Sequence, residues 1–171
     1  MTKIESDILV GIQKAAFDKP GVVKGARALS HFGEHSLGWM GLGAAGAVVA
    51  TVAKRDDKNL RNKWIRLGAA AFVAHAVSVV VKRIVRRKRP HDERIKVGVG
   101  TPSKLSFPSS HATSTSAALT ALSQISGSRV PLIGIPVMML SRMVLGVHYP
   151  TDVTVGALIG ALTAKFIMKE K

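Results

Sequence analysis

A long uncharged stretch bounded by ionisable side chains constrains this chain more than any other feature of its sequence. Residues 36–53 contain no charged side chain and lie between His35 and Lys54. At 1.5 Å per helical residue, these 18 residues cover about 27 Å, which is close to the thickness of a bilayer core. The stretch therefore predicts a membrane-spanning helix.

Four further segments extend this pattern. They are residues 64–84, 109–126, 130–147 and 151–168. Residues 109–126 are rich in Ala, Ser and Thr, so this helix is expected to face other helices rather than lipid. The sequence predicts an all-α polytopic membrane bundle with about five transmembrane helices. We divide the chain into an N-terminal interfacial helical segment, residues 1–35, and a transmembrane core, residues 36–171, which also carries the motifs described below.

The N-terminal segment has a different pattern. Ile4, Ile8 and Ile12 recur near one helical face, which predicts an amphipathic helix. Pro20 and Gly21 then break the chain, and a second short helix is expected over residues 22–32. Two placements of the first helix remain open: on the membrane surface, or against the loops of the bundle itself. Because acidic residues interrupt this segment, we do not interpret it as a cleavable signal peptide.

Composition narrows the partners. The net charge of +15 alone would suggest nucleic acid, but the charged and apolar residues are segregated along the chain, as in membrane proteins. Aromatic residues are only 5% of the chain, so platforms for stacking bases are scarce and no nucleic-acid partner is expected. Cysteine is absent, which excludes disulfides and thiolate metal sites.

Charge also bears on orientation. Counting the five crossings places 14 Lys and Arg residues on the side that holds the N-terminus, against 9 on the other side. The positive-inside rule therefore favours a cytoplasmic location for the first side. We expect a multi-pass protein of the plasma membrane with that side facing the cytoplasm.

Three segments carry groups suited to chemistry on a phosphate. They are Lys82 followed by six residues and Arg89-Pro90; Pro108-Ser109-Ser110-His111; and Ser141-Arg142, five residues, His148, three residues and Asp152. Hydropathy alone places all three on the same side of the membrane as the N-terminus. Segments that build one pocket must share one membrane face, and these are predicted to do so.

The cations in these segments suit phosphate binding. Lys82, Arg89 and Arg142 can surround the oxygens of a phosphate ester and shield their charge while a nucleophile approaches. Arg142 lies inside an apolar run, where a cation costs about 2.5–3.5 kcal/mol, so it indicates a functional site. For Lys82 and Arg89, the alternative is a role as membrane-interface anchors.

The serine segment predicts an anion site at the start of a helix. Pro108 suits the first turn, and the amides of Ser109, Ser110 and His111 would then point toward a bound anion. An ordinary serine cap is the alternative.

His148 and Asp152 are four residues apart, which brings both side chains to one face of a helix. A carboxylate on one imidazole nitrogen fixes the tautomer and leaves the other nitrogen free to attack. A histidine at a membrane interface without catalytic function is the alternative for each histidine alone.

Together the segments resemble the three-part motif of the type 2 phosphatidic acid phosphatase superfamily, with Ser110 in place of the usual Gly. The resemblance implies that His148 attacks phosphorus, Asp152 orients it, and His111 protonates the leaving alkoxide and later activates water. It implies that Lys82, Arg89, Ser109, Ser110 and Arg142 bind the phosphate. No cofactor is expected, and no other His, Asp or Glu cluster has ligand spacing, so we predict a metal-independent phosphatase.

A less specific stretch, residues 30–35, is similar to the small actinobacterial members that act on a polyprenyl-phosphoryl pentose phosphate. This implies the conversion of decaprenylphosphoryl-5-phosphoribose to decaprenylphosphoryl-ribose, a precursor of cell-wall arabinan in arabinogalactan. Polyprenyl pyrophosphate and phosphatidylglycerophosphate are alternative substrates. A non-enzymatic small transporter or scaffold is an alternative of another class, and a vanadate-dependent haloperoxidase is disfavoured by the spans. The expected partners are the bilayer and a lipid phosphate, and homo-oligomerisation is left open.

Other polar residues receive structural expectations. His31, Glu34 and His35 precede the first span and are expected at the pocket mouth. His75 lies within the second span, where a hydrogen bond between helices is the favoured interpretation. Four cations after that span are expected to be interfacial anchors or to contact lipid headgroups; they are Arg83, Arg86, Arg87 and Lys88.

Overall fold

The computed structural model describes residues 3–53 and 58–169. Its helices, in chain order, are α1 (Lys3–Ala16), α2 (Val22–Gly33), the 3₁₀ turn η1 (Glu34–Ser36), α3 (Leu37–Ala53), α4 (Lys58–Val85), α5 (Ser110–Ser126), the 3₁₀ turn η2 (Val130–Ile133), α6 (Gly134–Val144) and α7 (Pro150–Met168). The predicted all-α membrane bundle is confirmed. Val22–Ala53, Lys58–Val85 and Pro150–Met168 are long and apolar enough to cross a membrane, and Val130–Val144 is a shorter apolar segment.

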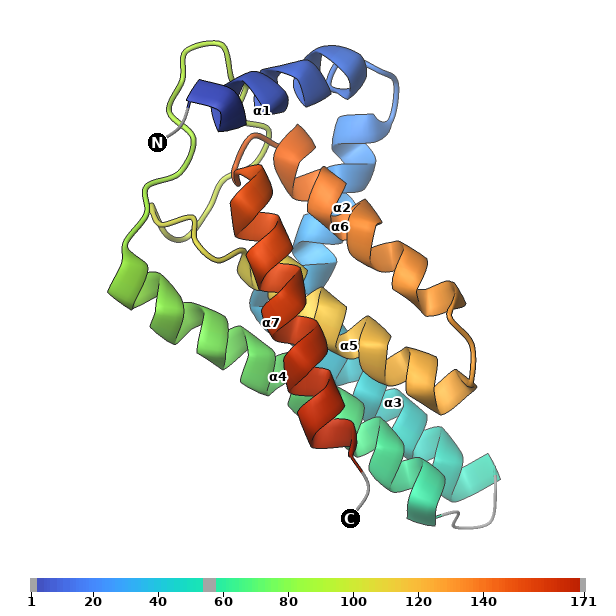
Figure 1. Ribbon diagram of the computed structural model, residues 1–171. Helices are drawn as coiled ribbons and strands as arrows, with labels where there is room; N and C mark the ends of the chain where they lie inside the picture. Colours follow the sequence, from blue (N-terminus) through green and yellow to red (C-terminus); the bar gives the residue numbers. More distant parts are fainter. Residues whose placement is uncertain (1–2, 54–57, 170–171) are drawn as a thin grey trace.

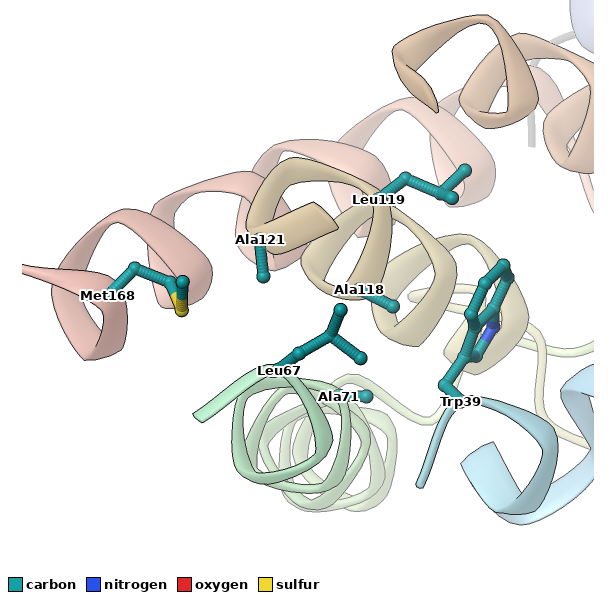
Figure 2. Close-up of a cluster of buried hydrophobic side chains, with 7 residues drawn as sticks. All are labelled: Trp39, Leu67, Ala71, Ala118, Leu119, Ala121 and Met168. Carbon is teal, nitrogen blue, oxygen red and sulfur yellow. The ribbon is translucent and has the colours of Figure 1, made fainter. Parts of the chain in front are cut away.

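Helix α5 is the centre of the bundle. Residues 112–119 are all buried, and α3, α4, α6 and α7 all pack against α5. Figure 2 shows one part of this core, in which Ala118 and Ala121 of α5 lie on the side of Leu67 of α4 and Trp39 of α3 packs in the same cluster. The indole nitrogen of Trp39 donates a hydrogen bond to the Thr115 hydroxyl at 3.1 Å. The expectation that this helix faces protein rather than lipid is confirmed.

Small residues allow α7 to lie close to α5. A Cβ added at Gly156 would lie 2.8 Å from the backbone oxygen of Ser109, and one at Gly160 would collide with the backbone oxygen of Thr113. Small residues four apart let membrane helices approach backbone to backbone. This close approach places the start of α7 directly beside the start of α5.

Helix α1 packs on the loops of its own bundle, which is the second of the two placements left open by the sequence. Figure 1 shows it lying across one end of the bundle, beside the loop of residues 86–109 and the start of α7. Leu9 and Val10 are buried in a cluster with residues of that loop, α5, α6 and α7. Ile4 and Ile8 remain exposed, whereas Ile12 is partly buried against that cluster, so only one end of the face predicted from the isoleucines packs on the protein.

Candidate active site

The three motif segments meet at the end of the bundle that α1 covers (Figure 1). The loop of residues 86–109 folds back on itself through an isolated antiparallel bridge between Lys88 and Leu105. The amide of Ser109 then donates to the backbone oxygen of Asp152 at 2.9 Å, which joins the second segment to the third. Residues far apart in the sequence are thereby held at one site.

A cavity of about 590 Å³ opens at this site. Six of the predicted site residues line it: Lys82, Arg89, Ser110, His111, Arg142 and His148. His31, Glu34 and His35 also line it, which confirms their expected position at the pocket. Three cations and two imidazoles around one cavity form a site suited to a phosphate group.

His148 lies between α6 and α7 and is almost completely buried. Its Nδ1 lies 3.6 Å from Oδ2 of Asp152, and its Nε2 lies 3.2 Å from the Arg89 guanidinium. The 3.6 Å separation is slightly too long for a hydrogen bond, and such contacts commonly shorten when substrate binds. Burial and the nearby guanidinium groups of Arg89 and Arg142 lower the pKa of His148 well below its ordinary value, so its imidazole is neutral at physiological pH.

Asp152 is fixed from two sides and is fully buried. Its Oδ2 accepts a hydrogen bond from the Tyr149 amide at 2.8 Å, which caps the start of α7. Its Oδ1 accepts from the Arg87 guanidinium at 2.9 Å. The carboxylate therefore has little freedom to turn away from His148.

Arg87 is the residue that the sequence interpretation misplaced. We expected an interfacial anchor, but its guanidinium bonds Asp152, Thr151 and Glu5 and lies 4.3 Å from the centre of the Tyr149 ring. Burial raises the pKa of Glu5, but hydrogen bonds from Thr151 and Arg87 outweigh it and place that pKa below its ordinary value. The N-terminal helix is thus tied to the carboxylate behind His148.

Ser30 of α2 contacts two of the predicted residues, although no specific role was predicted for it. Its hydroxyl accepts a hydrogen bond from Arg142 at 2.7 Å, and its backbone oxygen lies 2.9 Å from Nε2 of His111. A carbonyl only accepts, so Nε2 of His111 carries a proton and Nδ1 is the nitrogen available to exchange one. Gly33 allows this close packing, since a Cβ there would lie 2.8 Å from the His111 ring.

The cations differ in what they bind. Arg142 is 1% exposed, and its Nε has no hydrogen-bond partner in the described part of the chain. Arg89 donates to the backbone oxygens of Ser103 and Val147 at 2.8 Å each, and burial lowers its pKa to about 10, which leaves it charged at neutral pH. Lys82 donates to the backbone oxygen of Pro108 at 3.0 Å, so it also holds the loop that precedes α5.

One expectation at the start of α5 needs correction. The Ser109 hydroxyl caps the helix by accepting from the Ala112 amide at 3.5 Å, and its own amide is bonded to Asp152. Ser109 is fully buried and does not line the cavity, so its amide does not face an anion. Ser110 does line the cavity, with its hydroxyl 2.8 Å from that of Ser78 on α4.

His75 also departs from expectation. Its Nδ1 is buried without a hydrogen-bond partner in the described residues, rather than bonded to another helix. Its ring lies 5.9 Å from the His35 ring, centre to centre, and both line the cavity. The described residues contain no group of three or more His, Cys, Asp or Glu side chains placed to hold a metal ion.

Comparison with solved structures supports the fold. The structure of Aquifex aeolicus LpxE aligns with a TM-score of 0.73 at 21% identity, covering 99% of this chain and 97% of that one. The first transmembrane PAP2-type phosphatidylglycerolphosphate phosphatase from Bacillus subtilis aligns with a TM-score of 0.68 at 20% identity, covering 97% of this chain and 85% of that one. The chain shares their fold, and it is a membrane protein.

Comparison of sequences identifies the family. The chain is similar to decaprenylphosphoryl-5-phosphoribose phosphatases of Mycolicibacterium smegmatis, at 55% identity over 89% of this chain and 81% of that protein, and of Mycobacterium tuberculosis, at 47% identity over 95% and 88%. A sequence model described as the PAP2 superfamily matches residues 63–170, which include all three motif segments. The chain therefore belongs to the PAP2 superfamily of phosphatases.

Proposed function

We propose that this phosphatase hydrolyses the 5-phosphate of decaprenylphosphoryl-5-phosphoribose and releases decaprenylphosphoryl-ribose, a precursor of cell-wall arabinan. The observation that carries the proposal is the cavity in which Arg89, Arg142, His111 and His148 face one space. The names of the mycobacterial relatives, at 47–55% identity over most of the chain, support the choice of lipid.

In the proposed first step, Nε2 of His148 attacks phosphorus. A nitrogen–phosphorus bond forms, the bond from phosphorus to the ribose oxygen breaks, and Nδ1 of His111 gives a proton to the leaving alkoxide. Arg89, Arg142, Lys82 and the Ser110 hydroxyl stabilise the charge on the phosphoryl oxygens. The lowered pKa of His148 supports this role, because only a neutral imidazole has the lone pair that attacks.

In the second step, His111 takes a proton from water, whose oxygen bonds to phosphorus. The nitrogen–phosphorus bond breaks, and inorganic phosphate leaves. Asp152 stabilises the positive charge that His148 carries as a phosphoimidazole, through its carboxylate 3.6 Å from Nδ1. Each proton that His111 gives up in the first step is recovered in the second, as general acid–base catalysis requires.

We propose that the reaction needs no metal ion. Two guanidinium groups and one ammonium line the cavity, and in the proposed mechanism they supply the positive charge that a divalent cation supplies in other phosphatases. Activity of the purified protein in detergent should therefore be unchanged by EDTA. Loss of activity in EDTA, restored by a divalent cation, would contradict this part of the proposal.

The substrate is tested by a panel of lipids. We expect kcat/KM to be highest for decaprenylphosphoryl-5-phosphoribose, with free phosphate and decaprenylphosphoryl-ribose as products. Polyprenyl pyrophosphate and phosphatidylglycerophosphate are the comparison substrates. A preference of tenfold or more for either of them would overturn the proposed substrate while leaving the phosphatase mechanism in place.

We also propose that the site faces the cytoplasm in the plasma membrane. The chain has no cysteine, so single-cysteine variants report orientation without background. Glu93→Cys lies in the loop beside the site, and Arg129→Cys lies in the turn after α5; both positions are exposed. In intact cells, an impermeant maleimide should label Arg129→Cys and leave Glu93→Cys unlabelled; the reverse result would place the site outside.

A further inference from the structure

The cavity continues beyond the groups that the proposed reaction uses. It also extends along α2, η1 and the middle of α4, where His31, His35, His75 and Val79 line it. The phosphatase mechanism assigns these residues no step. We call this part of the cavity the second lobe; its several nitrogen donors suit a second acceptor group on the substrate.

Residues of one face of α4 line both lobes. His75, Val79, Lys82 and Arg83 follow the three- and four-residue spacing that brings side chains to the same side of a helix. His75 precedes Lys82 by seven residues, so it lies about 10 Å farther along the helix axis. The second lobe is therefore displaced from the catalytic groups toward the interior of the bundle.

Two imidazoles meet in this lobe. The rings of His35 and His75 lie edge to face, with centres 5.9 Å apart and planes at 61°. Nδ1 of His75 is buried and has no hydrogen-bond partner in the described residues. A buried polar atom without a partner is costly, and a turn of the ring that brings this nitrogen to the cavity would let a ligand remove that cost.

The backbone conformation that positions His35 is strained. His35 and Ser36 have φ of 49° and 58°, in the left-handed region that residues with side chains rarely adopt. The Ser36 hydroxyl donates to the backbone oxygen of Ala71 on α4 at 3.3 Å, which ties this turn to the helix that carries His75. The strained turn keeps the His35 ring beside the His75 ring.

We propose that His35 and His75 bind a second phosphate of the substrate, namely the phosphodiester that joins its sugar to the lipid. This inference rests on the proposed function, in which a terminal phosphomonoester, a small polyol and a lipid phosphodiester follow one another. A phosphodiester carries a single negative charge, so the two imidazole donors suit it, whereas the monoester needs the three cations of the catalytic lobe. The separation of the lobes along α4 accommodates the polyol between the two phosphates.

The test compares lipids that have the second phosphate with one that lacks it. Decaprenylphosphoryl-5-phosphoribose and phosphatidylglycerophosphate both carry a terminal monoester and a lipid phosphodiester, and phosphatidic acid carries the monoester alone. For His35→Ala and His75→Ala, we expect KM for the first two lipids to rise about tenfold, as for the loss of a charge-assisted hydrogen bond. We expect kcat to change less than twofold, and turnover of phosphatidic acid to match the wild type.

The matched control is His91→Ala, since His91 is exposed in the loop and does not line the cavity. Equal losses on all three lipids, or no change in KM, would overturn the second phosphate site. If the wild type rejects the ribose lipid but accepts phosphatidylglycerophosphate, the proposed substrate fails and the site is still tested on the accepted lipid. If it hydrolyses neither lipid with two phosphates, both proposals fail.

Discussion

Replacing Asp152 by asparagine tests the positioning of the nucleophile. Asn keeps the size of the side chain but converts one oxygen to an NH₂ group, which donates. Because Asp152 accepts from Arg87 at 2.9 Å and from the Tyr149 amide at 2.8 Å, either orientation of Asn brings the NH₂ group against a donor. The substitution also removes the charge that lies 3.6 Å from Nδ1 of His148.

The size of the effect follows from that geometry. In serine hydrolases, the same substitution of the triad aspartate lowers kcat about 10⁴-fold. Since the contact here is longer than a hydrogen bond, we expect Asp152→Asn to lower kcat on the order of 10²–10³-fold, or about 3–4 kcal/mol of transition-state stabilisation. We expect the first step to slow more than the second, because positive charge develops on His148 as the nitrogen–phosphorus bond forms and is lost as that bond breaks.

The assay is phosphate release from purified protein in detergent, under single-turnover and steady-state conditions. The matched control is Asp92→Asn, which changes a carboxylate in the loop of residues 86–109 whose hydrogen bonds, in the described residues, all go to its neighbour Arg94. We expect this control to retain wild-type kcat. A loss of less than threefold for Asp152→Asn in a folded protein would refute the orienting role.

Three further substitutions test other parts of the account. Ser30→Ala removes the hydroxyl that accepts from Arg142 but keeps the backbone bond to His111, so kcat/KM should fall about tenfold. The control Ser128→Ala, in a distant turn, should have no effect on kcat/KM. Glu5→Gln should lower the melting temperature above pH 4.5, because the lowered pKa of Glu5 keeps its carboxylate charged in the folded protein. The difference in melting temperature between the variant and the wild type should shrink as the pH falls through the folded-state pKa. A difference that does not depend on pH would contradict the ion pair. Gly160→Leu should lower the melting temperature by several degrees because α5 leaves no space there, whereas Gly41→Leu faces open space and should not; equal effects would argue against the close packing of α5 and α7.

The helices were predictable because hydropathy and charge set their lengths. The uncharged runs end where charged or loop residues begin. The helices predicted over residues 36–53 and 151–168 therefore differ from the observed α3 and α7 by only one residue, at the first position of each helix. The helix expected over 64–84 begins earlier, at Lys58, because α4 continues past the bilayer core into a polar turn with several cations. The assignment of residues 1–35 as a segment separate from the core stays a prediction.

The motif residues were predictable because their spacing in the sequence is specific, and the structure brings them together. The contacts that hold them were not predictable in the same way. Ser30 contacts Arg142, 112 residues away in the sequence, and Glu5 contacts Thr151, 146 residues away. Hydropathy predicts the helices but not which of these distant residues meet. Arg87 lies between two exposed cations, and only the fold of its loop distinguishes it from them.

The commitment of Ser109 to the α5 cap shows a further limit. A serine before a helix suits an anion site and a cap equally well, and the choice depends on what lies opposite. Here the backbone oxygen of Asp152 takes the Ser109 amide, because the glycines of α7 allow that helix to pack against the start of α5. Ser110 is thereby the serine that lines the cavity.

Trapping the phosphorylated enzyme tests the central claim most directly. Wild-type protein is mixed with substrate labelled in its terminal phosphate and quenched within milliseconds under alkaline conditions, and the labelled peptide is sequenced by mass spectrometry. The account predicts one acid-labile phosphate on His148, absent from His148→Ala. Label on a serine, or turnover at the wild-type rate by His148→Ala, would contradict it.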